Sequence, residues 1–288
     1  MKRPEVPTPH SRSLWYLLCG ALLFVGTGLG VDLYFDYLRI ASDAAASLSR
    51  HSAAAAADLQ RRLVSINMAM NGIRSNAPFF FSEKRGLEIA NRQLKVLADS
   101  LEGVRTLALF NAAGTMIASN RPEILNRNYA DRAYFQVPLK EKNPSRLYVS
   151  APIKTVLGVY SVVLSKSLVS ADGEFAGIVT ATLDPQDFKN TLEGAHDSPD
   201  SISAILHGNG QAFLFAPDAA ALPASDTAKM GDFFEDHKRS GLVTSVRTGF
   251  SPDTNAKRMM AMTTVYPPSL AMDYSLTISF SRDFDLFF

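Results

Sequence analysis

The sequence predicts an α+β fold in which a transmembrane helix and a second long helix precede two modules built on antiparallel sheets. Three features support this prediction: an uncharged apolar run near the N-terminus, an alanine-rich segment without proline, and two series of alternating strand patterns with hairpin turns. With 47% hydrophobic and 20% charged residues, the chain has enough apolar side chains for a sizeable core. The formal net charge of +1 argues against a nucleic-acid partner, which would require a basic face.

The run from Ser13 to Val31, SLWYLLCGALLFVGTGLGV, predicts the transmembrane helix. As a helix, this uncharged segment would span roughly 28 Å, about one bilayer core. Lysine and arginine precede the run and aspartate follows it, which predicts that residues 1–12 stay in the cytoplasm and residues 32–288 are exported. A cleaved signal peptide is the alternative, because small residues occur at 26–30, although no A-x-A pattern ends the run.

Residues 32–75 predict a long helix that continues directly from the membrane segment. Alanine, the best helix former, is abundant there, and apolar or small residues alternate spacings of four and three. This heptad-like seam either packs against the following domain or forms a dimeric stalk, and both interpretations stay open. The seam consists of Tyr34, Leu38, Ala41, Ala45, Leu48, Ser52, Ala55 and Leu59, then, after a shift of one residue, Leu63, Ile66, Met70 and Ile73.

The first predicted module covers residues 76–195. It begins with a helix over 84–101, followed by a hairpin over 104–120 in which Gly114 supplies the turn. Residues 121–145 are polar and predict a loop. Three strands then follow, and the module ends with a short helix over 184–193 that Asp184 caps. The three strands are expected over 146–153, 158–168 and 174–183.

The second predicted module covers residues 196–288 and repeats this plan in smaller form. A hairpin over 202–217 turns at Gly208-Asn209-Gly210, and helical material follows near 228–239. Strands are expected over 242–249, 257–266 and 273–281. The similarity between the two modules lies in the order of elements and not in the residues.

No enzyme signature is present. The five histidines are scattered without metal-ligand spacing, and no nucleophile elbow or phosphate loop can be assembled. The single cysteine, Cys19, leaves no pair for an intramolecular disulfide or a thiolate metal site. The sequence therefore predicts a protein that is not an enzyme and that carries no cofactor or metal.

The order of elements resembles the double Cache sensor domain of bacterial membrane receptors, in which two PAS-like modules follow a membrane helix and a long helix. The segment from NYADRAYFQ at 128–136 to GVYSVVLSKSLVSADGEFAGIVTATLDPQDF at 158–188 carries most of the likeness. GNGQAFLFAPD and YSLTISFSRDF resemble the first hairpin and last strand of the second module. The motifs are similar to those of diguanylate cyclase and histidine kinase receptors. The resemblance implies a sensor in the bacterial inner membrane, with residues 32–288 in the periplasm and a homodimer formed through residues 32–75.

The resemblance also implies a ligand pocket in the first, membrane-distal module, between the 121–145 loop and one face of the sheet. Small organic anions suit the residue types expected there. Arg132 would offer a bidentate fork to a carboxylate or phosphate, and Tyr134 and Phe135 would form an apolar wall, although Phe135 also suits a core plug. The remaining candidates come from the strands and are Tyr148, Lys154, Tyr160 and Thr182.

The sequence departs from the pattern of family members that bind amino acids. Thr182 stands where those members hold the ligand's ammonium group with an acid, and Ile153 and Thr155 replace an expected tyrosine and acid. A free amino acid is therefore a poor candidate ligand. The sequence also carries no output motif of the cyclase, kinase or chemoreceptor type.

Two functions are compatible with the sequence. The first is an extracytoplasmic small-molecule sensor whose distal module binds a small organic ligand. The second is a membrane-anchored domain that binds a partner or dimerises without a ligand of its own.

Overall fold

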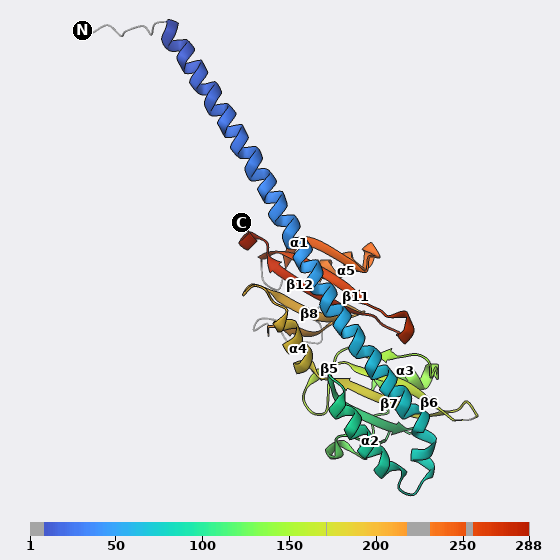
Figure 1. Cartoon of the computed structure of the whole chain (residues 1–288). Coiled ribbons are helices and arrows are strands. Elements are labelled where there is room, and N and C mark those ends of the chain that lie inside the picture. Colours follow the sequence, from blue (N-terminus) through green and yellow to red (C-terminus); the bar gives the residue numbers. More distant parts are fainter. Residues whose placement is uncertain (1–8, 171, 218–230, 252–255, 288) are drawn as a thin grey trace.

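One continuous helix, α1 (Pro9–Ser82), runs along the whole molecule (Figure 1). The structure, a computed structural model, describes residues 9–170, 172–217, 231–251 and 256–287. The segments predicted as a membrane helix and a long helix form a single helix without a break, which continues beyond residue 75 and includes Pro78 in its last turns. At 1.5 Å per residue its length is about 111 Å.

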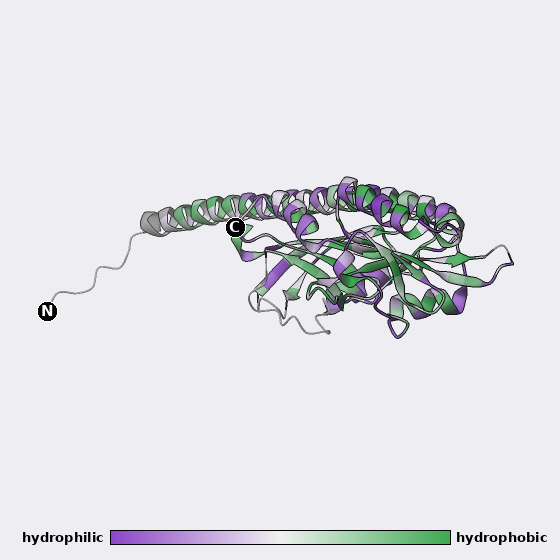
Figure 2. Cartoon of the chain, turned by 90° about the horizontal axis from the view of Figure 1, so that it is seen from below, coloured by the Kyte–Doolittle hydropathy of each residue, from purple (hydrophilic) through white to green (hydrophobic). Residues whose placement is uncertain are grey.

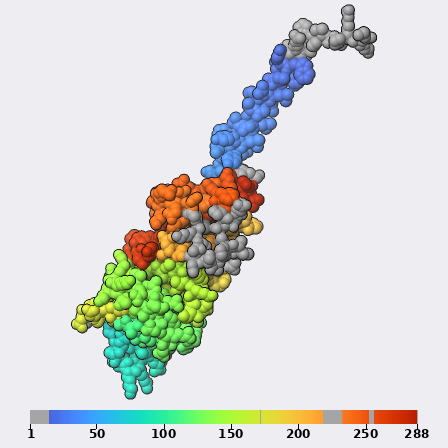
Figure 3. All heavy atoms as spheres, turned by 180° about the vertical axis from the view of Figure 1, so that it is seen from behind, coloured from blue at the N-terminus to red at the C-terminus, as the bar shows by residue number. Residues whose placement is uncertain are grey.

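The N-terminal part of α1 projects beyond the folded modules (Figures 2 and 3). By length and composition, α1 is the one helix among the described residues that could cross a membrane, and its apolar part is exposed. Trp15 and Tyr34 are 65% and 60% exposed. They are separated by roughly 28 Å of helix, a spacing typical of aromatic residues at the two surfaces of a bilayer.

The distal module contains a five-stranded antiparallel sheet with the order β2-β1-β7-β6-β3. Its strands are β1 (Val104–Asn111), β2 (Met116–Ser119), β3 (Tyr148–Val149), β6 (Val163–Val169) and β7 (Phe175–Leu183). A separate two-stranded ribbon joins β4 (Ile153–Lys154) and β5 (Tyr160–Ser161). The predicted strands over 146–153 and 158–168 are thus each divided into two short pieces.

Helices complete the distal module. α2 (Gly86–Ser100) packs beside α1, and α4 (Pro185–Gly194) begins at Asp184, whose side chain accepts a hydrogen bond from the Gln186 backbone N–H as expected. The prediction of a loop over 121–145 was wrong in part. The 3₁₀ turn η1 (Pro122–Ile124) and the helix α3 (Ala133–Glu141) lie within it, and α3 packs on β6, so burial of its apolar side outweighs the unfavourable proline at 138.

The proximal module contains the second five-stranded antiparallel sheet, with the order β10-β11-β12-β8-β9. Its α5 (Gly231–Ser240) packs on β10 and β11. Residues 218–230, which include the start of the helical segment predicted near 228–239, lie outside the described part of the chain. The sheet strands are β8 (Ile202–His207), β9 (Ala212–Ala216), β10 (Thr244–Ser251), β11 (Ala256–Val265) and β12 (Leu276–Asp283), with the short turns η2 (Pro268–Leu270) and η3 (Asp285–Phe287). The α+β fold with two antiparallel-sheet modules is therefore confirmed.

The seam on α1 packs against its own chain from Ala41 onward, where Ala41 and Ala45 are partly buried on the core. Leu63, Ile66 and Met70 are completely buried in the core that α1 shares with both sheets, whereas Tyr34 and Leu38 are exposed. Ser52 makes a hydroxyl hydrogen bond of 2.8 Å to Thr263 of β11. Packing against its own domain therefore uses the seam from residue 41 to the distal end.

The two modules meet at the backbone of Val149 in β3. Asp273 of the proximal module accepts a hydrogen bond of 2.7 Å from the Val149 N–H through Oδ1, and His207 Nε2 lies 3.2 Å from the Val149 carbonyl oxygen. The Asp273 N–H donates to the Leu147 carbonyl oxygen at 3.1 Å. One edge of β3 thus pairs with β6 of its own sheet, and the proximal module holds the other edge.

Lys166 of β6 is a buried cation on the face of the distal sheet that α1 covers. Its side chain is 2% exposed, and Nζ donates to Asn67 Oδ1 of α1 at 2.9 Å. Burial, and to a lesser extent the charge of Arg74, lower the Lys166 pKa to about 8. No carboxylate pairs with Lys166 among the described residues. The charged form is therefore disfavoured in the folded protein.

The Lys166 ammonium makes stability depend on pH. The pKa of Lys166 is lower in the folded protein than in the unfolded chain, so the unfolded chain binds more protons between these two pKa values. The free energy of unfolding therefore rises as the pH increases from about 8 towards the lysine pKa of the unfolded chain. From pH 7 to 9.5 we expect this residue to contribute a gain of about 2 kcal/mol in the free energy of unfolding. The measurement is denaturant unfolding of the full chain in detergent at several pH values. The gain should disappear in Lys166→Met and persist in Lys95→Met, an exposed control; equal pH profiles for Lys166→Met and wild type would contradict the assignment.

Candidate functional site

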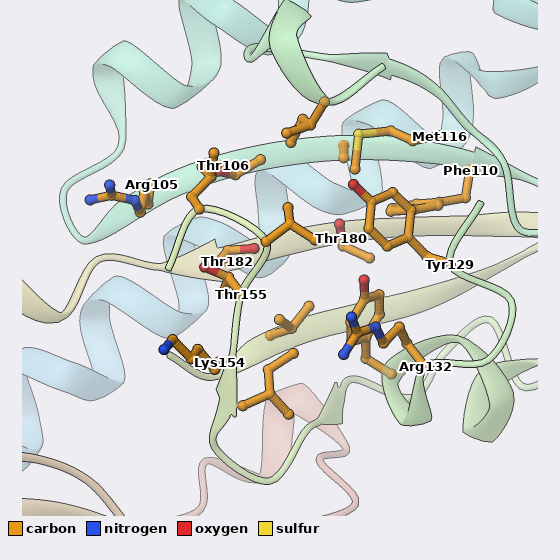
Figure 4. A pocket seen from close by; sticks show the side chains of 17 residues that line it. Arg105, Thr106, Phe110, Met116, Tyr129, Arg132, Lys154, Thr155, Thr180 and Thr182 are labelled. Atoms are coloured by element: carbon orange, nitrogen blue, oxygen red, sulfur yellow. The ribbon is translucent and has the colours of Figure 1, made fainter. Parts of the chain in front are cut away.

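The candidate site is a pocket on the face of the distal sheet opposite α1 (Figure 4). Alternation along the strands directs Thr106 of β1 and Thr180 and Thr182 of β7 to this face, while their neighbours pack under α1. The loop before α3 and the β4 ribbon form the other walls. The space between these side chains, with the open solvent at the mouth included, is about 560 Å³.

Backbone hydrogen bonds fix the loop that carries Tyr129 and Arg132. The Tyr129 N–H donates to the Gly114 carbonyl oxygen at 2.8 Å, and the Arg132 N–H donates to the Tyr129 carbonyl oxygen at 3.1 Å. Gly114 has φ +81°, and a side chain there would lie 2.6 Å from the Cβ of Ala130. The hairpin turn must therefore be glycine for the loop to approach this closely.

Cations outnumber anions around the pocket. Arg105, Arg132 and Lys154 line it, and no Asp or Glu does so among the described residues. Arg105 lies 3.6 Å from Asp184 outside the pocket, so its charge is partly compensated. The Arg132 guanidinium makes no hydrogen bond or ion pair with the described residues and is half-buried. The described lining of the pocket therefore carries a net positive charge.

A buried phenol without a partner also lines the pocket. Tyr129 is 4% exposed, and its hydroxyl makes no hydrogen bond. Burial raises the pKa of Tyr129, against the effect of Arg127 and Arg132, and burial likewise raises the pKa of Tyr134. Both phenols stay protonated at neutral pH and can donate a hydrogen bond. A buried hydroxyl without a partner costs free energy that a ligand acceptor would recover.

Four of the residues predicted for the site lie around this pocket. Arg132 and Tyr134 come from the start of α3, Lys154 from β4 and Thr182 from the end of β7. Figure 4 shows Arg132 on the side of Tyr129, with Arg105 and Lys154 at the other end and threonines between them. The structure thus brings together residues that are up to about fifty positions apart in the sequence.

The other three predicted residues lie elsewhere. Phe135 is 1% exposed and packs edge-on against Phe175 at 5.6 Å between ring centroids, so it belongs to the core and not to the pocket wall. Tyr148 lies in a cleft between the modules, under α3. Tyr160 lines a groove beside Phe213 and Lys189. Val162 and Leu164 pack on the α1 side of the sheet, whereas Val163 between them lines the pocket.

Several pocket residues were missed by the sequence prediction. Tyr129 stands inside the quoted NYADRAYFQ segment. It follows Asn128, whose Oδ1 accepts a hydrogen bond from the Ala130 N–H, and an asparagine in a polar segment is a usable turn signal. Thr106 and Arg105 belong to a mostly apolar strand, which is typical of a core strand, so neither residue was predicted for the site. Thr155 had been noted only as a departure from a family pattern. No group of three or more His, Cys, Asp or Glu that would suit a metal ion occurs in the part of the chain that the structure describes.

Comparison with solved structures identifies the architecture. The extracellular domain of the putative histidine kinase rpHK1S-Z16 is similar over 85% of this chain and 96% of its own length, with a TM-score of 0.73 and 19% identity. The chain has the fold of receptor sensor domains. A second similar structure is the ligand-binding domain of the Pseudomonas aeruginosa PAO1 amino acid chemoreceptor PctB in complex with L-Arg. Its TM-score is 0.61 at 14% identity, and the match covers 85% of this chain and 97% of that one.

A third neighbour is the ligand-binding domain of the Campylobacter jejuni chemoreceptor Tlp3 in complex with L-valine, with a TM-score of 0.57 and 14% identity over 88% of this chain and 98% of that one. No family model matches the sequence, and no curated protein matches it. The fold that the double Cache resemblance implies is therefore confirmed by structure.

The positions of Phe135 and Arg132 lead to opposite expectations for stability. Phe135→Ala leaves a cavity in the core and should lower the free energy of unfolding by roughly 3–5 kcal/mol. Arg132→Ala removes a side chain without a partner and should change it by less than about 0.5 kcal/mol. Denaturant unfolding of the full chain in detergent compares them. A large loss in Arg132→Ala would show that the arginine is structural.

Proposed function

We propose that the chain is the extracytoplasmic sensor of a bacterial membrane receptor and that the distal pocket binds a small organic anion. The observation that carries the proposal is the pairing of a guanidinium without a partner, Arg132, with a buried phenol without a partner, Tyr129, in one pocket. Both groups donate hydrogen bonds, and Arg132 adds positive charge. A carboxylate accepts from both.

The neighbouring structures support a small ligand but not the same ligand. PctB and Tlp3 are described in complex with amino acids. An amino acid carries an ammonium group, which requires an acid or several acceptors. Thr182 and Thr155 supply hydroxyls in this pocket, no Asp or Glu lines it among the described residues, and Asp184 beside it is engaged with Arg105. An organic acid without an amino group suits this lining better.

The signal would leave the distal module through α1. This helix contacts both sheets and leads directly to the exposed apolar segment that we assign to the membrane. A ligand changes the position of α1 only if it prefers one of two packing arrangements. The output would be of the diguanylate cyclase or histidine kinase type in the bacterial inner membrane. A homodimer would use residues 32–40 and the outer face of α1, because the seam from Ala41 onward packs on the core of its own chain.

Short carboxylates should stabilise the protein. The full chain in detergent is heated with a panel of mono- and dicarboxylates, and a binder at one hundred times its Kd should add about 2.7 kcal/mol. Arg132→Gln should abolish the shift, whereas the exposed control Arg127→Gln should retain it. The sensor proposal fails if no carboxylate shifts the melting temperature. In that case a ligand-free interaction domain becomes the better explanation.

Tyr129→Phe tests the pocket in a different way. Without ligand, removal of a buried hydroxyl that has no partner should leave stability unchanged or raise it by up to about 1 kcal/mol. The carboxylate that stabilises wild type should bind at least about tenfold more weakly, because one hydrogen bond to a charged group is lost. Isothermal titration calorimetry measures both affinities. Unchanged affinity would remove Tyr129 from the site.

A further inference from the structure

A second cleft separates the two modules on the other side of Tyr134. It contains about 510 Å³ of space between side chains, its mouth included. Tyr134 and Val137 of α3 form one wall, and Tyr148 and Ser165 of the distal sheet form the floor. His207 and the Asp273–Tyr274 pair close it from the proximal module. The cleft is distinct from the anion pocket, with which it shares Tyr134 alone.

The charge of this cleft is opposite to that of the anion pocket. No Lys or Arg lines it among the described residues, and Asp273 is its one carboxylate. Asp273 Oδ1 accepts hydrogen bonds from the Val149 N–H at 2.7 Å and the Tyr274 N–H at 2.9 Å, but no cation pairs with the group and Oδ2 makes no hydrogen bond. Burial raises the pKa of this carboxyl, as expected for an anion that lacks a counter-charge.

The remaining lining is partly aromatic and contains one buried hydroxyl without a partner among the described residues. The rings of Tyr274 and His207 lie with their centroids 4.7 Å apart. The Ser165 hydroxyl is completely buried and makes no hydrogen bond with the described residues. The Tyr148 phenol lies near Glu141, Asn143 and Ser167, and burial, followed by the Glu141 carboxylate, raises its pKa. The Ser165 hydroxyl therefore lines the same cleft as the Asp273 carboxylate and lacks a partner there.

We propose that the cleft between the modules is a second binding site, for a small organic amine. The ammonium group would pair with Asp273 Oδ2, the hydrocarbon part would lie against Tyr134 and Tyr274, and the Ser165 hydroxyl would accept one of the remaining N–H groups. Aromatic faces and one carboxylate are the groups that attract organic cations. The site does not depend on an anion binding in the distal pocket.

The test uses the full chain in detergent and two probes of similar shape and opposite charge, 2-phenylethylamine and 3-phenylpropionate, with isothermal titration calorimetry as the measurement. The amine should bind at the cleft and the acid should not. Asp273→Asn should weaken amine binding at least tenfold, while its amide oxygen still accepts the Val149 and Tyr274 N–H groups and preserves the fold. Asp99→Asn, an exposed acid on α2, and Arg132→Gln should leave amine binding unchanged.

Three results would overturn the proposal. They are no heat of binding for the amine, equal affinity in wild type and Asp273→Asn, and displacement of the amine by 3-phenylpropionate. If Asp273→Asn fails to fold, as judged by circular dichroism, Ser165→Val replaces it. This variant should bind the amine several-fold more weakly, and unchanged affinity would count against the cleft. Loss of amine binding in Arg132→Gln would instead place the amine in the distal pocket.

Discussion

The packing of one face of α1 against both sheets is the constraint on which the rest of the structure depends. Leu63, Ile66 and Met70 are fully buried in a core shared by the two modules. The polar contacts on the same face fix the register. Ser52 meets Thr263 near one end, and Asn67 meets Lys166 near the other. A shift of α1 by one helical turn would separate both pairs and leave a buried ammonium without an acceptor, which costs far more than an exposed ion pair gains.

The junction between the modules gives the distal pocket a physical connection to the proximal module. The backbone of Val149 is held by Asp273 and His207, and β3 lies next to β6 and α3. Tyr134 at the start of α3 lines the distal pocket on one side and the cleft between the modules on the other. A displacement of Tyr134 would therefore alter the lining of both cavities.

Local signals in the sequence predict most of the elements, because they are chemically specific. Gly114 adopts the positive φ that its turn requires, and Asp184 caps its helix as the position predicts. Half of the site could not be predicted in the same way. Tyr148 lies in the cleft that the start of α3 covers, and a helix was not predicted there. Tyr160 was grouped with Val162 and Leu164, but those two residues pack on the α1 side of the sheet.

The direction of the Phe135 side chain could not be predicted either, because the helix that contains it was not predicted. Within a segment interpreted as a loop, neighbouring side chains have no fixed directions. Once Ala133 begins a helix, residue 135 points to the sheet and Arg132 remains at the rim. The membership of Tyr129 and Arg105 in one pocket depends on strand pairing across the sheet, which local patterns do not encode.

The hydrogen bond between Ser52 and Thr263 joins residues 211 positions apart. During synthesis, α1 leaves the ribosome first, but the strands that cover its proximal half are among the last to appear. The apolar face of α1 is therefore buried only after β11 and β12 have been synthesised. Contacts between residues so far apart in the sequence form slowly. Until then the helix exposes the surface that it will later hide, which makes the nascent chain a substrate for chaperones and ties the folding of the proximal module to completion of the chain.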